Sequence, residues 1–133
     1  MIAGLVPFAA GEMDAEMRRA LDERAHLMEQ RASALVESAL ASGAHWIASL
    51  RRIPSDARPA AEWRSHARIV AAYRDRYGVF EDDALGAPAN SPNRRMDAAA
   101  AAVARDRAIW LSRADAPAQP RQAQSRVRAV HSL

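Results

Sequence analysis

Apolar side chains recur at steps near 3.6 residues over the first third of the chain. The stripe consists of Met13, Met17, Leu21, Met28, Leu35, Val36, Ala39 and Leu40. This period predicts an amphipathic helix from about Glu12 to Ser42, with Gly43 as its stop. Oppositely charged residues four apart, such as Asp14 and Arg18, support its polar face. At roughly 45 Å, such a helix must pack along another long helix or a partner, or break partway.

A short helix is predicted next, over residues 44–51. It would bury Trp46, Ile47 and Leu50. The prolines within residues 54–59 then break the helical pattern. Ser55 or Asp56 can cap the helix that follows, and Pro59 is tolerated in its first turn.

The third predicted helix runs from about Ala57 to Tyr77 and carries one seam. The seam residues are spaced by 3, 4, 3 and 4 positions: Trp63, His66, Val70, Tyr73 and Tyr77. This spacing is typical of a face packed against a neighbouring helix or a partner. Gly78 stands where a left-handed residue ends a helix, and Val79 can fold back on the last turn.

A loop and a fourth helix complete the pattern. Residues 80–91 are a loop by composition, and Ser91-Pro92 reads as a cap followed by proline at the first helical position. We expect the helix to run from Pro92 to about Arg113. Its inward face is predicted to hold Met96, Ala99, Ala100, Val103 and Trp110. The alanine run 98–102 favours helix and lets a neighbour approach closely.

These elements predict an all-α protein of three to four helices, a helical hairpin or small bundle with a long first helix. No strand-like alternation interrupts the helical periods. We divide the chain into an N-terminal extension (1–11), a helical domain (12–114) and a tail (115–133). The tail lacks any core pattern, so we expect it to be disordered.

Charge is distributed unevenly between these parts. All 19 basic residues are arginines, and residues 1–115 hold 16 of them beside 16 acidic residues. The net charge of +3 therefore comes from Arg121, Arg126 and Arg128 in the tail. A nucleic-acid-binding domain gathers its basic residues on one face. The distribution therefore weakens the case for such a domain.

Several classes of chemistry have no support in the sequence. The chain has no cysteine, which excludes disulfides and thiolate sites and fits a reducing cytoplasm. No run approaches the roughly 20 apolar residues of a membrane span. The start MIAGLVPFAA lacks a basic flank and a cleavage-like sequence, so no signal peptide is expected. No phosphate loop or nucleophile elbow occurs. The sequence predicts no enzyme, cofactor, membrane partner or small-molecule substrate.

Histidines and acidic residues also give no metal motif. His26 with Glu29, and Glu62 with His66, have helical spacing, but neither pair has the second histidine of a zinc-binding helix. His66 is interpreted as a partly buried core histidine. The acidic run 81–83 lacks the alternating oxygen ligands of a calcium loop. It is interpreted as solvated.

The stretch VAAYRDRYG, residues 70–78, permits two interpretations. Exposed tyrosines beside Arg74 and Arg76 would suit base stacking and phosphate contacts. On a helix, however, Tyr73 and Tyr77 share the seam with Val70, while Arg74 turns away from it. Tyrosines on such a seam normally bury their rings. Helical geometry therefore favours packing over nucleic-acid binding.

A family resemblance rests on the segment from His45 to Gly86. The residues that carry it are Trp46-Ile47-x-x-Leu50, Pro54-x-Asp56, Trp63, the stretch VAAYRDRYGV and Asp83-x-Leu85-Gly86. This segment resembles a region of the large MobF (TrwC-like) conjugative relaxase-helicases of actinobacteria. The likeness extends less specifically upstream through ERAHLMEQRASAL, and covers about half of the chain.

The resemblance implies an accessory module and no active relaxase. In that family such helical regions look like segments outside the catalytic domains, which nick DNA with a tyrosine and a histidine-bound metal or carry nucleotide-binding loops. This chain has neither the histidine cluster nor a phosphate loop. No catalytic role is therefore carried over to Tyr73 or Tyr77.

The sequence leads to one expected role and two alternatives. We expect a non-enzymatic helical interaction module, associated with conjugative DNA processing and acting through a protein partner or self-association along the long helix. The alternative is a small DNA- or RNA-binding protein. Its phosphate contacts would be Arg51, Arg52, Arg74, Arg76, Arg121, Arg126 and Arg128. A third interpretation is a remnant reading frame without a selected function.

Overall fold

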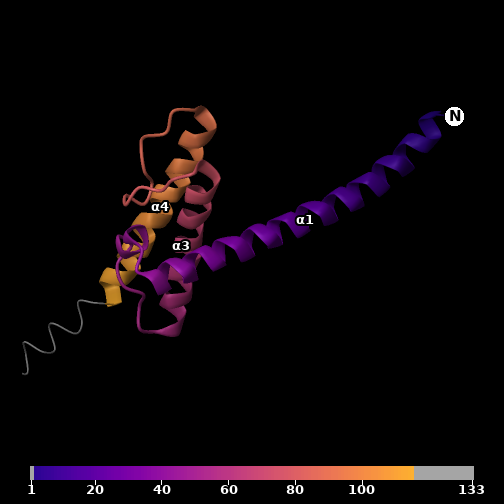
Figure 1. The fold of residues 1–133 in the computed structure, drawn as a ribbon. Coiled ribbons are helices and arrows are strands. Elements are labelled where there is room, and N and C mark those ends of the chain that lie inside the picture. The colour runs from indigo at the N-terminus through magenta and orange to yellow at the C-terminus, as the bar shows by residue number, and fades with distance from the viewer. Residues whose placement is uncertain (1, 116–133) are drawn as a thin grey trace, which may run out of the picture. The chain divides into compact units, whose positions relative to one another are not determined.

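The computed structural model describes residues 2–115, with side chains from residue 14 onward, and within this range the chain forms four helices and no strand (Figure 1). The helices are α1 (Ile2–Ser42), α2 (His45–Ala48), α3 (Ala57–Tyr77) and α4 (Pro92–Asp115). The predicted all-α fold with a long first helix is confirmed. α1 begins at Ile2, before the predicted start at Glu12, although residues 2–11 include Gly4, Pro7 and Gly11.

The predicted helix ends at Gly78 and Ser91 are confirmed. Gly78 adopts a left-handed conformation with φ of 60°, and the Val79 N–H donates to the Arg74 carbonyl oxygen at 2.9 Å. At the start of α4, the Arg94 N–H donates to the Ser91 hydroxyl oxygen at 3.3 Å. Both contacts satisfy backbone groups that a helix end leaves without an intrahelical partner.

The start of α3 differs from the prediction in its capping. Asp56 precedes the helix, but its carboxylate makes no capping hydrogen bond. Its backbone carbonyl instead accepts from the Ala60 N–H at 3.0 Å. The Ser55 hydroxyl donates to the Asp115 carboxylate at 3.1 Å, so this side chain contacts the end of α4 and does not cap α3.

Contacts divide the chain into two compact units, residues 1–31 and 32–133. In the first unit, every described side chain of residues 14–31 is exposed. These exposed residues include the predicted stripe members Met17, Leu21 and Met28. In the second unit the stripe is buried at Val36 and Ala39 and partly buried at Leu35 and Leu40. The stripe therefore enters a core only over its second half.

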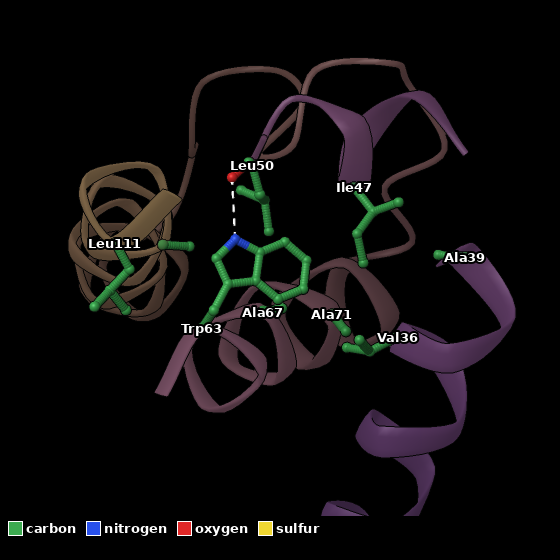
Figure 2. Close-up of a cluster of buried hydrophobic side chains, with 9 residues drawn as sticks. Val36, Ala39, Ile47, Leu50, Trp63, Ala67, Ala71 and Leu111 are labelled. Carbon is green, nitrogen blue, oxygen red and sulfur yellow. Dashed lines mark hydrogen bonds between the residues drawn. The ribbon is translucent and has the colours of Figure 1, made fainter. Parts of the chain in front are cut away.

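Trp63 lies at the centre of the second unit's core (Figure 2). Its side chain is 0% exposed, and its indole N–H donates to the Leu50 carbonyl oxygen at 3.1 Å. The surrounding core residues come from all four helices and the turn after α2: Val36, Ala39, Ile47, Leu50, Ala67, Ala71, Ala108 and Leu111. A buried indole needs such an acceptor, because an unpaired N–H in an apolar core is costly.

α3 and α4 lie side by side and run antiparallel (Figure 1). The buried clusters along the pair join Trp63 to Leu111, Val70 to Ala104, and Tyr73 to Ala101. α4 thus presents mainly alanines to the bulky side chains of α3. Small residues at these positions let the two helix axes approach closely while the α3 side chains fill the space between them.

The predicted inward face of α4 was wrong. Met96, Val103 and Trp110 are exposed large apolar side chains, and Ala99 and Ala100 are exposed as well. The buried face instead carries Ala101, Ala104, Ala108, Leu111 and Ser112. The bulky seam of α3 leaves room only for small side chains opposite it, so α4 is rotated with its larger residues outward.

The predicted basic tail, with Arg121, Arg126 and Arg128, lies outside the described residues. Asp115, which we assigned to the tail, is the last residue of α4. Among the helices of residues 2–115, none is long and apolar enough to cross a membrane.

Candidate functional site

The residues of the predicted α3 seam pack against other parts of the same chain. Trp63, Val70 and Tyr73 are buried, and His66 and Tyr77 are half-buried. Their neighbours include buried residues of α4 and of the loop after α3. A partner that binds this unit must therefore contact other surfaces.

Nδ1 of His66 is buried and has no hydrogen-bond partner. Among the described residues it is the only buried side-chain nitrogen or oxygen atom of this kind. Burial lowers the pKa of His66, the positive charge of Arg107 lowers it further, and Glu62 opposes the shift. The imidazole is therefore neutral near pH 7. No group of three histidine or acidic side chains within residues 14–115 is placed to hold a metal ion.

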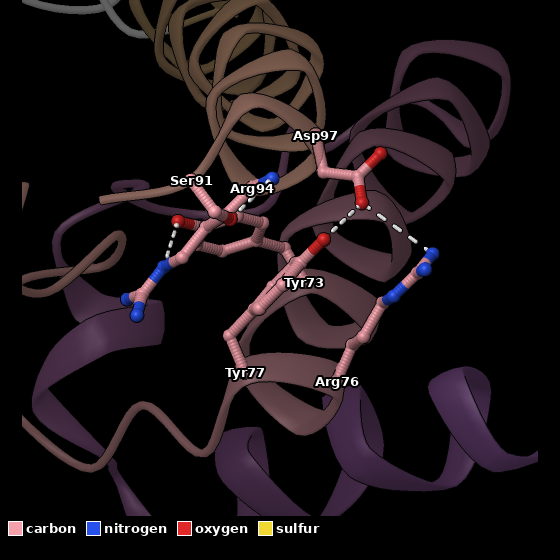
Figure 3. Close-up of polar contacts among 6 residues, drawn as sticks. All are labelled: Tyr73, Arg76, Tyr77, Ser91, Arg94 and Asp97. Carbon is pink, nitrogen blue, oxygen red and sulfur yellow. Dashed lines mark hydrogen bonds and ion pairs between the residues drawn. The ribbon is translucent and has the colours of Figure 1, made fainter. Parts of the chain in front are cut away.

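The two tyrosines of the seam form a polar cluster with α4 (Figure 3). Their ring centroids lie 5.0 Å apart. Arg94 Nε donates to the Tyr73 hydroxyl at 3.0 Å, and the Arg94 guanidinium lies 5.2 Å from the Tyr77 ring centroid. The Tyr77 hydroxyl donates to Asp97, which raises the pKa of Tyr77. Asp97 also pairs with Arg76 at 3.4 Å.

The contacts within this cluster argue against nucleic-acid binding by the two tyrosines. Base stacking requires an accessible ring face, but the Tyr73 side chain is buried and the Tyr77 ring contacts both Tyr73 and Arg94. Arg76 is paired with Asp97. The tyrosines and arginines of VAAYRDRYG are thus engaged by the protein itself.

Arg74 organises the loop that follows α3. Its Nη1 donates to the carbonyl oxygens of Asp83 at 2.8 Å and Ala84 at 3.1 Å, and its Nη2 donates to that of Glu81 at 3.0 Å. The guanidinium also lies 5.1 Å from the Trp46 ring centroid. Burial lowers the pKa of Arg74, and the loop carboxylates oppose this shift. These contacts engage both terminal nitrogens of the guanidinium within the protein.

We expect Arg74→Ala to lower the free energy of unfolding by about 2 kcal/mol. The substitution removes three charge-assisted hydrogen bonds and leaves the carbonyl of the buried Ala84 without its donor. Urea denaturation followed by circular dichroism measures the change. Arg76→Ala is the matched control, because it removes only exposed contacts: the ion pair with Asp97 and the stacking on the Tyr77 ring at 5.5 Å, each worth less than about 1 kcal/mol. Equal losses for the two variants would contradict the role of Arg74.

The loop after α3 is held by its own side chains as well. The Asp83 carboxylate accepts from the Leu85 N–H at 3.1 Å, and the Glu81 carboxylate accepts from the Ala87 N–H at 3.0 Å. The Gly86 N–H donates to the Asp83 carbonyl at 3.2 Å. The acidic run 81–83 is exposed, as predicted, but it also supplies the acceptors that close the loop.

The loop presents Phe80 beside a pocket. The Phe80 side chain is 90% exposed, although Val79 next to it is buried. The pocket has a volume of about 240 Å³ and is lined by Leu35, Trp46, Ala71, Arg74, Asp75, Gly78, Val79 and Phe80. This volume is below the roughly 300–1,000 Å³ that is typical of small-molecule sites, so the pocket is better suited to a protein contact. We therefore take Phe80 and this pocket as the candidate functional site.

Sequence reasoning missed Phe80 because the loop was interpreted by its polar composition alone. A single large apolar residue directly before three acidic residues was the signal that could have identified it. The remaining predicted phosphate contacts in the described range, Arg51 and Arg52, are exposed between α2 and α3. They do not line the pocket.

Comparisons of the chain with protein-family models, with curated protein sequences and with solved structures gave no match. The resemblance to MobF relaxase-helicases therefore stays a prediction from the sequence.

Proposed function

We propose that this protein is a non-enzymatic helical interaction module that binds a protein partner in conjugative DNA processing. The single observation that supports the binding role is Phe80, exposed beside the pocket on an internally bonded loop. The association with conjugation rests on the resemblance of residues 45–86 to MobF relaxase-helicases.

The construction of the loop supports a role for Phe80 in recognition. An exposed phenylalanine on a mobile segment would lose conformational freedom on binding, which weakens the complex. Here Arg74, Asp83 and Glu81 hold the loop backbone before any partner arrives. Binding hot spots are enriched in large aromatic side chains, and a backbone that is already held lowers the cost of ordering such a side chain on binding.

The proposal is tested with purified chain and a purified MobF-class relaxase-helicase. We expect a complex in biolayer interferometry, and we expect Phe80→Asp to weaken it by about thirtyfold, the effect of losing about 2 kcal/mol at a hot spot. Because Phe80 is exposed, the substitution should leave the thermal unfolding midpoint unchanged.

Val103→Asp is the matched control. Val103 is also an exposed apolar residue of the second unit, but it lies on α4 and does not line the pocket. We expect this variant to bind as the unmodified chain does. If the unmodified chain does not bind, or if both variants lose affinity equally, the proposed role of Phe80 is wrong.

A further inference from the structure

The surface around Phe80 carries an excess of negative charge. The acidic run 81–83 directly follows Phe80, all three of its residues are exposed, and residues 77–93 contain no basic residue. Arg74 lines the pocket, but its terminal nitrogens donate to carbonyl oxygens of the loop. A carboxylate accepts several hydrogen bonds, so those that close the loop can still bind a cation. The site therefore suits a basic segment with an apolar side chain.

Residues 116–133 of the same chain have this composition. They hold no acidic residue, whereas the rest of the chain is balanced in charge. Val127 lies between two arginines, and Val130 follows three positions later. An aliphatic side chain flanked by long cationic ones can contact an aromatic ring while the guanidinium groups bind carboxylates at its rim. The arginines of this segment are Arg121, Arg126 and Arg128.

The chain after α4 is long enough to bring Val127 to the pocket. α4 ends at Asp115, whose carboxylate accepts from the Ser55 hydroxyl just before α3 begins. The pocket lies along the second half of α3 and the loop after it. The 21 residues of α3 span about 30 Å. Residues 116–127 cover about 40 Å when extended, so the distance can be bridged within one chain.

Charge and tethering distinguish this occupant from a second copy of the site. Two copies that faced each other at Phe80 would bring their acidic runs 81–83 together, and like charges across an interface are unfavourable. A segment tethered by roughly ten residues has an effective concentration in the millimolar range. The chain's own basic segment therefore reaches the site ahead of the same segment from another chain.

We propose that residues 126–130 bind beside Phe80 of the same chain, with Val127 at the pocket and Arg126 and Arg128 on the carboxylates of the run 81–83. The bound segment competes with an external partner for Phe80. This regulatory consequence rests on the proposed function, whereas the contact itself is tested without a relaxase.

Because the chain has no cysteine, a designed disulfide can report the contact in the full-length protein. We expect Ser125→Cys combined with Ala87→Cys to form an intrachain disulfide in a glutathione buffer at least about tenfold faster than Ser125→Cys combined with Val103→Cys. Ala87 is exposed on the loop, and its replacement keeps all three acidic residues.

Val103→Cys is a demanding control. The Val103 side chain is 63% exposed on the outer part of α4. It lies only about 18 Å along that helix from Asp115. A segment without a docking site would therefore meet Val103 at least as often as it meets Ala87. Equal disulfide rates at the two positions would overturn the proposal. Mainly interchain disulfides would also overturn it, because they assign the segment to a second copy.

Single charge reversals separate a specific contact from general attraction. In the Ser125→Cys, Ala87→Cys chain, Arg128→Glu should slow disulfide formation by about fivefold to tenfold, because it places like charges together. Arg121→Glu makes the same change in net charge outside the proposed segment, and we expect little effect from it. If the two reversals slowed the reaction equally, attraction to the whole basic segment would explain the result and the proposal would be wrong.

The regulatory consequence is measured with the purified relaxase-helicase. Arg128→Glu should bind it about fivefold more tightly than the unmodified chain does, because the competing segment is weakened. Unchanged affinity would contradict regulation by this segment. If neither chain bound the relaxase-helicase, the proposed function would be wrong, and the disulfide rates would still decide whether residues 126–130 bind beside Phe80.

Discussion

Trp63→Ala should lower the free energy of unfolding of the second unit by about 3–5 kcal/mol. The indole is 0% exposed and is surrounded by residues from all four helices. Its removal leaves a cavity that these helices cannot close without rearranging the whole core. The Leu50 carbonyl also loses its buried donor. Urea denaturation followed by circular dichroism measures the loss.

Two comparisons separate the contributions of Trp63. Trp63→Phe keeps most of the apolar volume but removes the indole N–H, so we expect an intermediate loss of about 1–3 kcal/mol. Trp110→Ala is the matched control, because the Trp110 side chain on α4 is 57% exposed. Its loss should stay below about 1 kcal/mol. Similar losses for Trp63→Ala and Trp110→Ala would show that the core is not built around Trp63.

Gly86→Ala should destabilise the protein by about 2–4 kcal/mol, the sum of a backbone cost and a packing cost. Gly86 has φ of 67°, where a side chain costs about 1 kcal/mol. A Cβ at this position would also lie 2.7 Å from Val79 Cγ1 and 2.2 Å from Glu81 Oε2. Val79 is buried and cannot yield without disturbing its neighbours, whereas the exposed Glu81 side chain can move if its carboxylate releases the Ala87 N–H. Such overpacking adds about 1–3 kcal/mol.

Gly43→Ala isolates the backbone part of this effect. Gly43 has the same φ of 67°, but a Cβ there would meet no atom within 4 Å. We therefore expect a loss of only about 1 kcal/mol. Thermal unfolding of the two variants side by side provides the measurement. If Gly43→Ala proved as damaging as Gly86→Ala, the close packing of the loop would not be the cause.

The residues that carry the resemblance to MobF relaxase-helicases have structural positions in this fold. Trp46, Leu50 and Trp63 belong to the core around Trp63 or pack against it. Asp83 and Gly86 build the loop that presents Phe80.

Local features of the fold were predictable because their causes are local. A left-handed glycine ends α3 at Gly78, and a serine cap followed by proline begins α4 at Ser91. Both depend on backbone geometry within a few residues. The period of the seam likewise predicted burial of Trp63, Val70 and Tyr73, since residues at spacings of three and four share one helix face.

The candidate site was not predictable in this way. Arg74 was predicted to turn away from the seam, but the sequence did not indicate that it would bind three carbonyl groups of the loop. Nor did the sequence indicate that Phe80 would be exposed while Val79 is buried. Each depends on how residues 79–87 fold back on α3, which is a property of many contacts together.

Periodicity and capping act over short distances, so the order of the main helices, most of their ends and the seam of α3 could be predicted from the amino-acid pattern. The buried face of α4 depends instead on how the helices pack against one another. Alanines face α3 and the larger Met96, Val103 and Trp110 face outward. Hydrophobicity alone predicted the opposite, because it does not include the volume that the side chains of α3 leave between two close helices.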